Sequence, residues 1–451
     1  MPELTSGLIK KSIMYKLSNY NYFTAYEQRV ICLNGITGRM FSVSSQEYEN
    51  LKELFSDLIT FQIQYGSVFN RFKEWGFIVD ENTDEIDIVR FRNKQSVMSN
   101  KFYRLIINPT VECIFNCWYC SQHKNDTGGM KEDVMEKVKK HIDFMFERER
   151  ITGFYLDWFG GEPLMYFDEV MYPLAQYGLE KVKQHNLPFF QHVTTNAYLI
   201  NPEMVEKMKE IQLKSFQITI DGDEKRHNSI RNIHGRPTFR RIMDNIVLLC
   251  EQIPDVNVIL RLNFDEKTLS AANMVDVFDL IPEQYRRNIS IDFQRVWQTK
   301  KSEMPDNPVL LDLYQQSDRL GYRVGVPGGF ELGRRAKCYA DRYFHSVINY
   351  DGKVYKCTLY MQKESGILHD NGVIEWDNQT LVELYSKATF ENDRCLACKC
   401  LPLCLGPCSQ IAKSKTTLPC NLDMTEISMN NFIIETYKRK KEYSDKVAKA
   451  V

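Results

Sequence analysis

The chain has 451 residues, of which 43% are hydrophobic and 26% charged, and its formal net charge is only −1. This length allows two or three domains with buried cores, and the balanced charge argues against a partner bound through bulk charge, such as nucleic acid. The first thirty residues lack the apolar stretch of a signal peptide, and no later segment reaches the roughly 18 uncharged apolar residues of a spanning helix. We therefore expect a cytoplasmic protein without a membrane span.

The first 98 residues contain a predicted β-hairpin followed by helices. Two strand-like segments, 30–34 and 39–43, flank a four-residue connection with glycine at both ends. Ser44 and a glutamate three residues later form a capping-box pattern, and a further helix is predicted over 60–74. The arrangement resembles the small winged-helix, PqqD-like recognition domain of several peptide maturases, which binds a precursor's leader by adding its strand to a sheet edge. A purely structural cap on the next domain is the alternative.

Residues 99–330 alternate short strand-like runs with longer amphipathic stretches, after a charged connecting helix predicted over 80–94. The alternation is typical of repeated βα units with a parallel sheet. Six strands are too few to close an eight-stranded barrel, so we expect an α/β fold with an open, TIM-like (β/α)6 partial barrel. The predicted strands are 103–108, 154–159, 189–195, 215–220, 256–264 and 289–296. The predicted helices are 131–148, 168–185, 202–211, 238–252 and 268–280.

Three cysteines, Cys113, Cys117 and Cys120, lie on one short loop directly after the first predicted strand, with Tyr119 before the last of them. Four thiolates normally hold an iron–sulfur cubane, so a three-cysteine loop leaves one iron open to a ligand that is not protein. The spacing C-x3-C-x2-C resembles the signature of radical S-adenosylmethionine (SAM) enzymes, in which the open iron chelates SAM. The alternative is a zinc site, for which His123 is the local candidate as a fourth ligand.

Glycines and polar side chains follow the later strands. Gly160, Gly161 and Glu162 come after the second strand, where the glycines allow close approach of a ligand and the carboxylate can accept bonds from an ammonium group. This GGEP segment resembles the methionine-binding segment of the radical SAM family. The resemblance also implies that polar side chains after the third, fourth and fifth strands contact the ribose and carboxylate of SAM. These residues are Asn196, Thr219, Asp221, Arg231, Arg261 and Asn263.

A second group of cysteines falls in residues 331–425 and resembles the seven-cysteine SPASM domain, which carries two auxiliary [4Fe–4S] clusters. The resemblance implies an outer cluster held by Cys395, Cys398, Cys404 and Cys420, and an inner cluster with three assigned ligands, Cys338, Cys357 and Cys408. Cys400 is an extra thiol that either completes a cluster or packs. A pair of zinc ribbons is the alternative for these cysteines.

A few features lie outside these motifs. Cys32 and Cys250 occur in apolar runs and are predicted to be buried, inert thiols. His227 falls in a predicted polar loop, where solvation is the default and an active-site role is the alternative. Residues 426–451 are predicted to form an exposed terminal helix with a basic run over 438–441.

The resemblance as a whole implies a radical SAM enzyme with a SPASM extension that modifies a ribosomally synthesised precursor peptide carrying a leader. The implied cofactors are SAM and three [4Fe–4S] clusters, and the implied electron donor is a flavodoxin- or ferredoxin-type protein. Thioether or carbon–carbon cross-linking is the preferred reaction. One alternative is an anaerobic sulfatase-type maturase, whose catalytic aspartate would stand where this chain has Thr358. Others are a peptide epimerase and a non-catalytic peptide-binding or electron-transfer protein.

Overall fold

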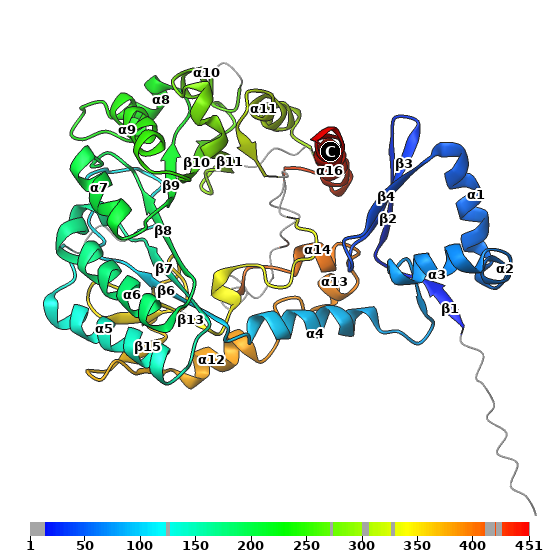
Figure 1. Ribbon diagram of the computed structural model, residues 1–451, viewed down its shortest axis with the longest axis horizontal. Helices are drawn as coiled ribbons and strands as arrows, with labels where there is room; N and C mark the ends of the chain where they lie inside the picture. The colour runs from blue at the N-terminus through cyan, green and yellow to red at the C-terminus, as the bar shows by residue number, and fades with distance from the viewer. Residues whose placement is uncertain are drawn as a thin grey trace, which may run out of the picture.

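The structure, a computed structural model, describes residues 14–122, 127–270, 274–299, 306–325, 330–410, 420 and 426–450. His123 lies outside these residues. Figure 1 shows a crescent of strands with helices on its outer side, and a small N-terminal domain beside the opening of the crescent. Helix α4 (Glu85–Val97) connects the two, and the last helix, α16 (Met429–Ala450), lies between them. No helix in the described part of the chain combines the length and the apolarity needed to cross a membrane.

Parallel strands form the crescent, and all six predicted strands are confirmed to within one residue at each end. They are β6 (Phe102–Ile107), β7 (Gly153–Trp158), β8 (Phe189–Thr195), β9 (Ser215–Ile220), β10 (Asn257–Phe264) and β11 (Ile289–Arg295). They lie side by side in chain order and every neighbouring pair is parallel. The predicted open, partial (β/α) barrel is therefore confirmed.

The sheet is longer at both edges than the six predicted strands. β12 (Arg323–Val324) pairs in parallel with β11, and β13 (His345–Ile348) pairs in parallel with β6. Three antiparallel strands then extend the β13 edge, namely β14 (Lys353–Tyr355), β15 (Gly366–Leu368) and β16 (Ile374–Trp376). The short helices that follow are α12 (Asn378–Tyr385), α13 (Asp393–Leu396) and α14 (Leu401–Cys404). The cysteine-rich region is thus joined to the barrel by a shared sheet.

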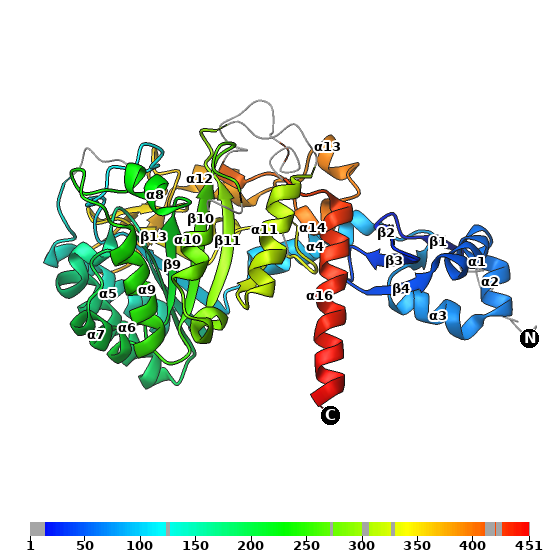
Figure 2. The ribbon, with the colours of Figure 1, turned by 90° about the horizontal axis from the view of Figure 1, so that it is seen from above.

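Helices cover the outer side of the crescent, while its concave side is polar. In β10, Leu260 and Leu262 are fully buried, whereas Arg261 and Asn263 line a cavity on the concave side. Burying each such leucine contributes about 1.5–3 kcal/mol. The covering helices are α5 (Glu132–Glu147), α6 (Tyr172–His185), α7 (Pro202–Glu210) and α9 (Phe239–Gln252) (Figure 2). Helix α11 (Pro308–Arg319) lies beside the β12 edge.

One predicted barrel helix starts later than expected. The prediction was a helix over 268–280, but residues 265–270 form turns and α10 spans Val275–Asp279. The carboxylate of Asp265 accepts hydrogen bonds from the backbone N–H groups of Lys267 (2.9 Å) and Thr268 (3.1 Å). Such side-chain bonds compete with the first turn of a helix, which explains the late start.

The N-terminal domain contains the predicted hairpin, with one strand added. β2 (Asn21–Tyr26), β3 (Arg29–Asn34) and β4 (Met40–Ser44) form an antiparallel sheet. The predicted capping box at Ser44 and Glu47 is present at the start of α1 (Ser45–Ser56). The helix predicted over 60–74 is two helices, α2 (Leu58–Gln64) and α3 (Gly66–Glu74), because Tyr65 between them leaves helical geometry (φ −131°, ψ 46°). A ribbon of β1 (Tyr15–Leu17) and β5 (Ile78–Asp80) completes the domain.

Helix α16 covers one face of this N-terminal sheet. Phe432 and Ile433 are buried with Ile31 and Leu33 of β3, and the Tyr437 hydroxyl lies 2.8 Å from the Ser42 Oγ. The other face of the sheet packs against the aromatic side chains of α1 to α3. The prediction of an exposed terminal helix is wrong for the first half of α16, because the exposed apolar face of the sheet needs a cover.

Candidate functional site

A cavity of about 330 Å³ opens at the carboxyl ends of the parallel strands, and the three-cysteine loop forms one of its walls. Cys113, Cys117 and Cys120 all line it. The structure also brings most of the predicted SAM-pocket residues to this cavity, and those in its lining are Tyr119, Gly160, Gly161, Asn196, Thr219, Arg231, Arg261 and Asn263. The carboxylates of Glu162 and Asp221, both nearly inaccessible to solvent, support the lining from behind. The volume lies in the range of small-molecule sites.

The two glycines of the GGEP segment are required by packing against the cysteine loop. A Cβ on Gly160 would lie 2.2 Å from the Thr110 carbonyl oxygen, and one on Gly161 would lie 1.9 Å from the Glu112 carbonyl oxygen. The Gly161 N–H donates to the Thr110 carbonyl oxygen (3.0 Å), and Gly160 has a positive φ of 115°. The glycines therefore let the loop after β7 lie directly on the backbone that leads into the cysteine loop. The sequence alone indicated only that the two glycines allow a ligand to approach the backbone closely.

Glu162 ties the end of β7 to the end of β8. Its carboxylate accepts hydrogen bonds from the Thr195 hydroxyl (2.6 Å), the Asn196 N–H (2.7 Å) and the Leu164 N–H (3.0 Å). Burial raises the pKa of Glu162, while these three bonds act in the opposite direction. The protein itself thus engages both oxygens, and a contact between Glu162 and an ammonium group stays a prediction.

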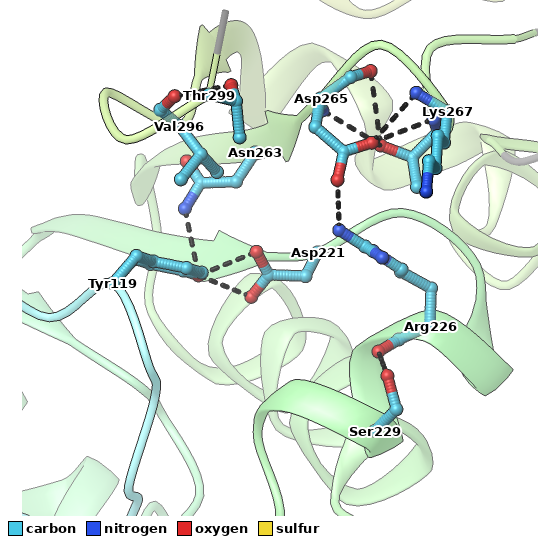
Figure 3. Close-up of polar contacts among 10 residues, drawn as sticks. Tyr119, Asp221, Arg226, Ser229, Asn263, Asp265, Lys267, Val296 and Thr299 are labelled. Atoms are coloured by element: carbon cyan, nitrogen blue, oxygen red, sulfur yellow. Dashed lines mark hydrogen bonds and ion pairs between the residues drawn. The ribbon is translucent and has the colours of Figure 1, made fainter.

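Tyr119 stands at the centre of a polar network that joins the cysteine loop to β9 and β10 (Figure 3). Its hydroxyl lies 2.6 Å from both carboxylate oxygens of Asp221 and accepts bonds from Arg231 and Asn263, each at 3.0 Å. The Arg231 Nε also donates to Asp221 at 2.5 Å. Burial alone would lower the pKa of Arg231, but Asp221 and Tyr119 outweigh it and hold that pKa well above its usual value. The network fixes Tyr119, and with it the second half of the cysteine loop.

The thiol of Cys113 lies in surroundings that favour a bound cation. Burial, together with the negative charges of Glu162 and the other two cysteines, raises its pKa to about 12. The Asn196 amide lies 3.8 Å from its sulfur. A thiolate at this position needs a positive partner, and iron is a natural one for three thiolates on one loop. The donor set therefore fits an iron–sulfur cluster.

His227 does not occupy a solvated loop, contrary to the prediction. It lies on the short helix α8 (Glu224–Ile230) and is fully buried. Its Nδ1 accepts a bond from the Asp221 N–H (3.4 Å), and its Nε2 lies 3.3 Å from the Thr238 hydroxyl. Burial, with a contribution from Arg231, lowers the pKa of His227 to about 3. The neutral ring supports the Asp221 loop from behind. Asp223 at the N-cap was the sequence signal for this helix.

A second, smaller cavity of about 80 Å³ lies in the cysteine-rich region. It is lined by Cys395, Cys398, Cys404 and Cys420, the four cysteines assigned to the outer cluster from the sequence, together with apolar residues such as Leu401. Arg394, Gly406 and Pro407 complete its lining. Cys395 is held by the Asn392 side chain, which caps α13 through the Cys395 N–H (3.0 Å).

The three cysteines assigned to the inner cluster also lie close to one another. Burial raises the pKa of Cys338 to about 11, and the nearby thiols of Cys357 and Cys408 contribute to this increase. The segment after Cys357 reaches the first cavity, because Leu359 lines it and the Gln122 side chain donates to the Thr358 carbonyl oxygen (3.3 Å). The chain segment that follows Cys357 therefore contributes to the cavity of the three-cysteine loop, whereas the three cysteines themselves are not in its lining.

Cys400 belongs to neither arrangement as a lining residue. Its N–H donates to the Cys398 sulfur at 3.4 Å, and its side chain packs against the apolar cluster that contains Tyr22 of the N-terminal sheet. Cys32 and Cys250 are buried, as predicted. Among the described residues, no three His, Cys, Asp or Glu side chains converge closely enough to hold a single metal ion.

Comparisons with known proteins identify the barrel. Residues 107–275 match the family model of the Radical SAM superfamily. A segment of 121 residues is 31% identical to an uncharacterized protein of Methanocaldococcus jannaschii, and the match spans 27% of this chain but only 39% of that relative.

Solved structures extend the likeness beyond the barrel. The structure of anSMEcpe with bound AdoMet is similar over 76% of this chain and 99% of that chain, with 19% identity and a TM-score of 0.55. Streptococcus suis SuiB bound to precursor peptide SuiA is similar over 90% of this chain and 98% of that chain, with 16% identity and a TM-score of 0.51. At these identities the likeness concerns the fold.

The residues around the first cavity fit the groups that this superfamily binds. Three thiols on one loop match a cluster with an open iron, and both glycines of the GGEP segment line the same cavity. Residues 107–275 therefore form a radical SAM domain, and the superfamily to which it belongs binds a [4Fe–4S] cluster and SAM.

Proposed function

We propose that the protein is a radical SAM enzyme that modifies a ribosomally synthesised peptide. The observation that carries this proposal is the first cavity, which is lined by the three-cysteine loop, by the strand ends and by Leu359, two residues after Cys357. A cavity of about 330 Å³ leaves space beyond the sulfurs for SAM and for a substrate side chain. When the cluster and SAM are bound, their one-electron reduction would provide the chemistry needed to abstract a hydrogen atom from the substrate.

The residues of the first cavity take distinct parts. Cys113, Cys117 and Cys120 hold the cluster, and the bare backbone at Gly160 and Gly161 accepts the methionine portion of SAM. Asn196, Thr219, Arg261 and Asn263 offer polar groups to the ribose and carboxylate. The Tyr119, Asp221 and Arg231 network does not itself react; it orients the loop and excludes water from behind it.

Two further clusters complete the proposed cofactor set. Cys395, Cys398, Cys404 and Cys420 hold the outer one, which the presence of all four thiols in the lining of one cavity supports. Cys338, Cys357 and Cys408 hold the inner one, next to the substrate. Clusters held by these cysteines would supply an acceptor for the electron released when a new bond closes in the substrate, which favours a thioether or carbon–carbon cross-link. A flavodoxin- or ferredoxin-type protein supplies the first electron.

A sulfatase-type maturation reaction is the weaker alternative. In that group an aspartate would stand at the position of Thr358. The Thr358 hydroxyl is buried and lies 2.7 Å from the Tyr339 hydroxyl. A threonine held in this way offers no acid or base at cellular pH, so it cannot take the place of a carboxylate.

The peptide substrate is supported by the neighbours and by the N-terminal domain. A structure of anSMEcpe holds the Cp18Cys peptide, and SuiB was solved with precursor peptide SuiA. Because residues 99–451 make up less than four fifths of the chain, the SuiB likeness includes part of residues 1–98. The outer edge of β4 has no strand neighbour among the described residues, and we propose that a leader strand adds there.

Co-expression with the small open reading frame beside the gene tests the proposal. The peptide product should be two hydrogens lighter than its precursor when a cross-link forms, and unchanged when Cys113, Cys117 and Cys120 are replaced by Ala. Anaerobically reconstituted enzyme should carry three cubanes, about twelve irons. A protein that never forms 5′-deoxyadenosine from SAM under reduction would sink the proposal.

The leader edge has its own test. The Asn34 N–H donates to the Arg39 carbonyl oxygen, which makes these two residues a hydrogen-bonded pair of the antiparallel ladder between β3 and β4. Hydrogen-bonded and non-hydrogen-bonded pairs alternate along such a ladder, so the N–H groups of Met40 and Ser42 point away from β3. Met40→Pro removes one outward donor without removing a bond to β3. The precursor should bind about tenfold more weakly to this variant, while Met40→Leu binds normally. SAM cleavage without peptide should be equal in both, and equal precursor affinity would exclude this edge.

A further inference from the structure

An exposed row of aromatic rings lies at the amino ends of the first three barrel strands. This aromatic row consists of Phe102 of β6, Tyr155 of β7 and Phe190 of β8. The ring centroids of Phe102 and Tyr155 are 5.7 Å apart, and those of Tyr155 and Phe190 are 4.8 Å apart. Phe102 is 41% exposed and Phe190 is 46% exposed. A single exposed phenylalanine needs no explanation, whereas adjoining exposed rings form an apolar patch of the kind that marks an interaction site.

The strands hold these rings in place. The Phe102 ring lies where a side chain on Gly153 of β7 would stand, since a Cβ there would be 2.2 Å from the Phe102 Cε1 atom. The Arg104 guanidinium lies over the Tyr155 ring, 4.7 Å from its centroid, and donates to the Asp157 carboxylate at 2.9 Å. The aromatic row is therefore a preformed surface on the barrel strands.

The aromatic row lies on the same face of the sheet as the first cavity. Side chains alternate along β8, so Phe190, His192 and Thr194 share the concave face, while Val193 is fully buried on the other face. The parallel register places Tyr155 beside Phe190, and Thr194 lines the first cavity. The four steps from Phe190 to Thr194 span about 13 Å at about 3.3 Å per residue. One strand thus carries both the end of the aromatic row and part of the cavity lining.

The surface between the aromatic row and the cavity is suited to a single extended chain. The strands curve around this face (Figure 1), so a narrow peptide can reach the rings more easily than a flat protein surface can. The His192 Nδ1 lies 2.9 Å from the Ser215 hydroxyl. The His192 Nε2 has no hydrogen-bond partner among the described residues, so it can bond to a group of a peptide backbone.

We propose that the precursor peptide lies extended on this concave face, with one large apolar or aromatic side chain on the aromatic row and the residue to be modified in the first cavity. An extended peptide also advances about 3.3 Å per residue, so these two peptide residues should be about four to six positions apart. The inference rests on the proposed function, because it requires a peptide substrate at the first cavity. It deepens that function by giving the substrate a recognition element separate from the leader edge at β4.

Photochemical cross-linking tests the position of the peptide. The full-length reconstituted enzyme carries the photoreactive amino acid p-benzoylphenylalanine at position 190 and is irradiated with the precursor encoded beside the gene. Mass spectrometry then locates the peptide residue that is joined, and the product of the wild-type enzyme locates the modified residue. The two should be about four to six positions apart. A larger separation, a cross-link in the leader or a cross-link to a second copy of the enzyme would overturn the inference.

Kinetic measurements with matched variants test the contribution of the rings. Phe190→Ala and Phe102→Ala should each raise the KM for the precursor at least about tenfold, as expected for an aromatic anchor, with a smaller change in kcat. Phe190→Leu keeps a large apolar side chain and should retain most of the affinity. Phe91→Ala is the control and should leave KM unchanged, because Phe91 is an exposed phenylalanine on α4 outside the aromatic row. Iron content and melting temperature should match the wild type in all four variants.

Two other results are decisive. An unchanged KM in both Phe190→Ala and Phe102→Ala would overturn the inference alone, with the proposed function intact. A wild-type enzyme that forms neither 5′-deoxyadenosine nor a modified peptide would contradict the proposed function and the inference together. The activity of the wild type on the precursor distinguishes these two failures.

Discussion

The two cysteine-lined cavities of this protein differ in what surrounds the sulfurs. The first has three cysteines, about 330 Å³ of space and polar strand ends on its far side. The second has four cysteines, about 80 Å³ and mainly apolar neighbours. A cluster in the first cavity would keep one iron without a cysteine ligand, and that iron would face a space lined by polar side chains. A cluster in the second cavity would have four cysteine ligands and would be enclosed. The number of thiols and the space beyond them thus separate a site for chemistry from one for electron transfer.

The largest effect should come from removing thiols in one cavity or the other. Replacing Cys113, Cys117 and Cys120 with Ala should abolish reductive SAM cleavage, because no other described cysteine lines that cavity. Replacing Cys395 and Cys398 with Ala should leave SAM cleavage within a few-fold of wild type but stop formation of the peptide product. Chromatography of 5′-deoxyadenosine and peptide mass measure the two outcomes. Equal loss of SAM cleavage in both variants would remove the distinction between the cavities.

A glycine substitution tests the first cavity separately from the second, because it displaces the loop after β7 that forms part of the first cavity. Gly161→Ala places a methyl group within 1.9 Å of the Glu112 carbonyl oxygen, so the cysteine loop must shift. We expect a loss of SAM cleavage of at least about 100-fold, since small misplacements of a reacting group cost that much. Gly66→Ala is the control, because a Cβ there meets nothing within 4 Å. Normal turnover by the Gly161 variant would show that the loop tolerates the shift.

Disrupting the polar network around Tyr119 should reduce activity less than the Gly161 substitution does. Tyr119→Phe removes the hydroxyl shared by Asp221, Arg231 and Asn263 and leaves a buried ion pair short of one partner. The expected cost is about 1–3 kcal/mol, seen as a weaker affinity for SAM in equilibrium dialysis, while the second cavity keeps its iron. Tyr198→Phe is the matched control, since the Tyr198 ring packs on Phe115 outside this network. Equal SAM affinity in the two variants would contradict the role given to the hydroxyl.

The smallest effect is the pH dependence contributed by His227, one of four histidines in the described part of the chain whose pKa is lowered by burial, the others being His141, His192 and His345. His227 behind the Asp221 loop has a pKa lowered to about 3, below the 6.5 of an unfolded histidine. Its contribution to stability is therefore complete above pH 6.5 and is lost as the pH falls toward 3. Between pH 7 and pH 5.5 the free energy of unfolding should fall by about 1 kcal/mol through this residue.

Denaturant titration of wild type and His227→Gln at both pH values measures this contribution. The variant should be less stable at pH 7 but show a shallower decrease. No histidine is among the described residues that line the second cavity, so the iron content of the outer cluster should not follow the same curve. Parallel decreases in wild type and variant would exclude His227 as the source.

The sequence was sufficient for features that depend on local pattern. Short β-branched and aromatic runs located the six central parallel strands but not β12 and β13, and the resemblance of the cysteine pattern to a SPASM domain grouped the four residues that line the second cavity. Contacts between distant segments were not accessible in this way. Gly161 packs on a backbone some fifty residues earlier, His227 is buried by the fold around it, and α16 covers a sheet from the other end of the chain. These contacts depend on which distant segments become neighbours in the folded chain, and local sequence patterns do not show this.

The docking of α16 on the N-terminal sheet also has a consequence for biosynthesis. The apolar face of the sheet, with Tyr22, Ile31 and Leu33, is complete once β4 ends at Ser44, but its cover begins at Met429. At roughly 5–20 residues per second, a ribosome would need about 20–80 s to make the intervening chain. During that time the apolar face of the N-terminal sheet would be exposed to solvent. Nascent chains of this protein should therefore depend on a chaperone until translation ends.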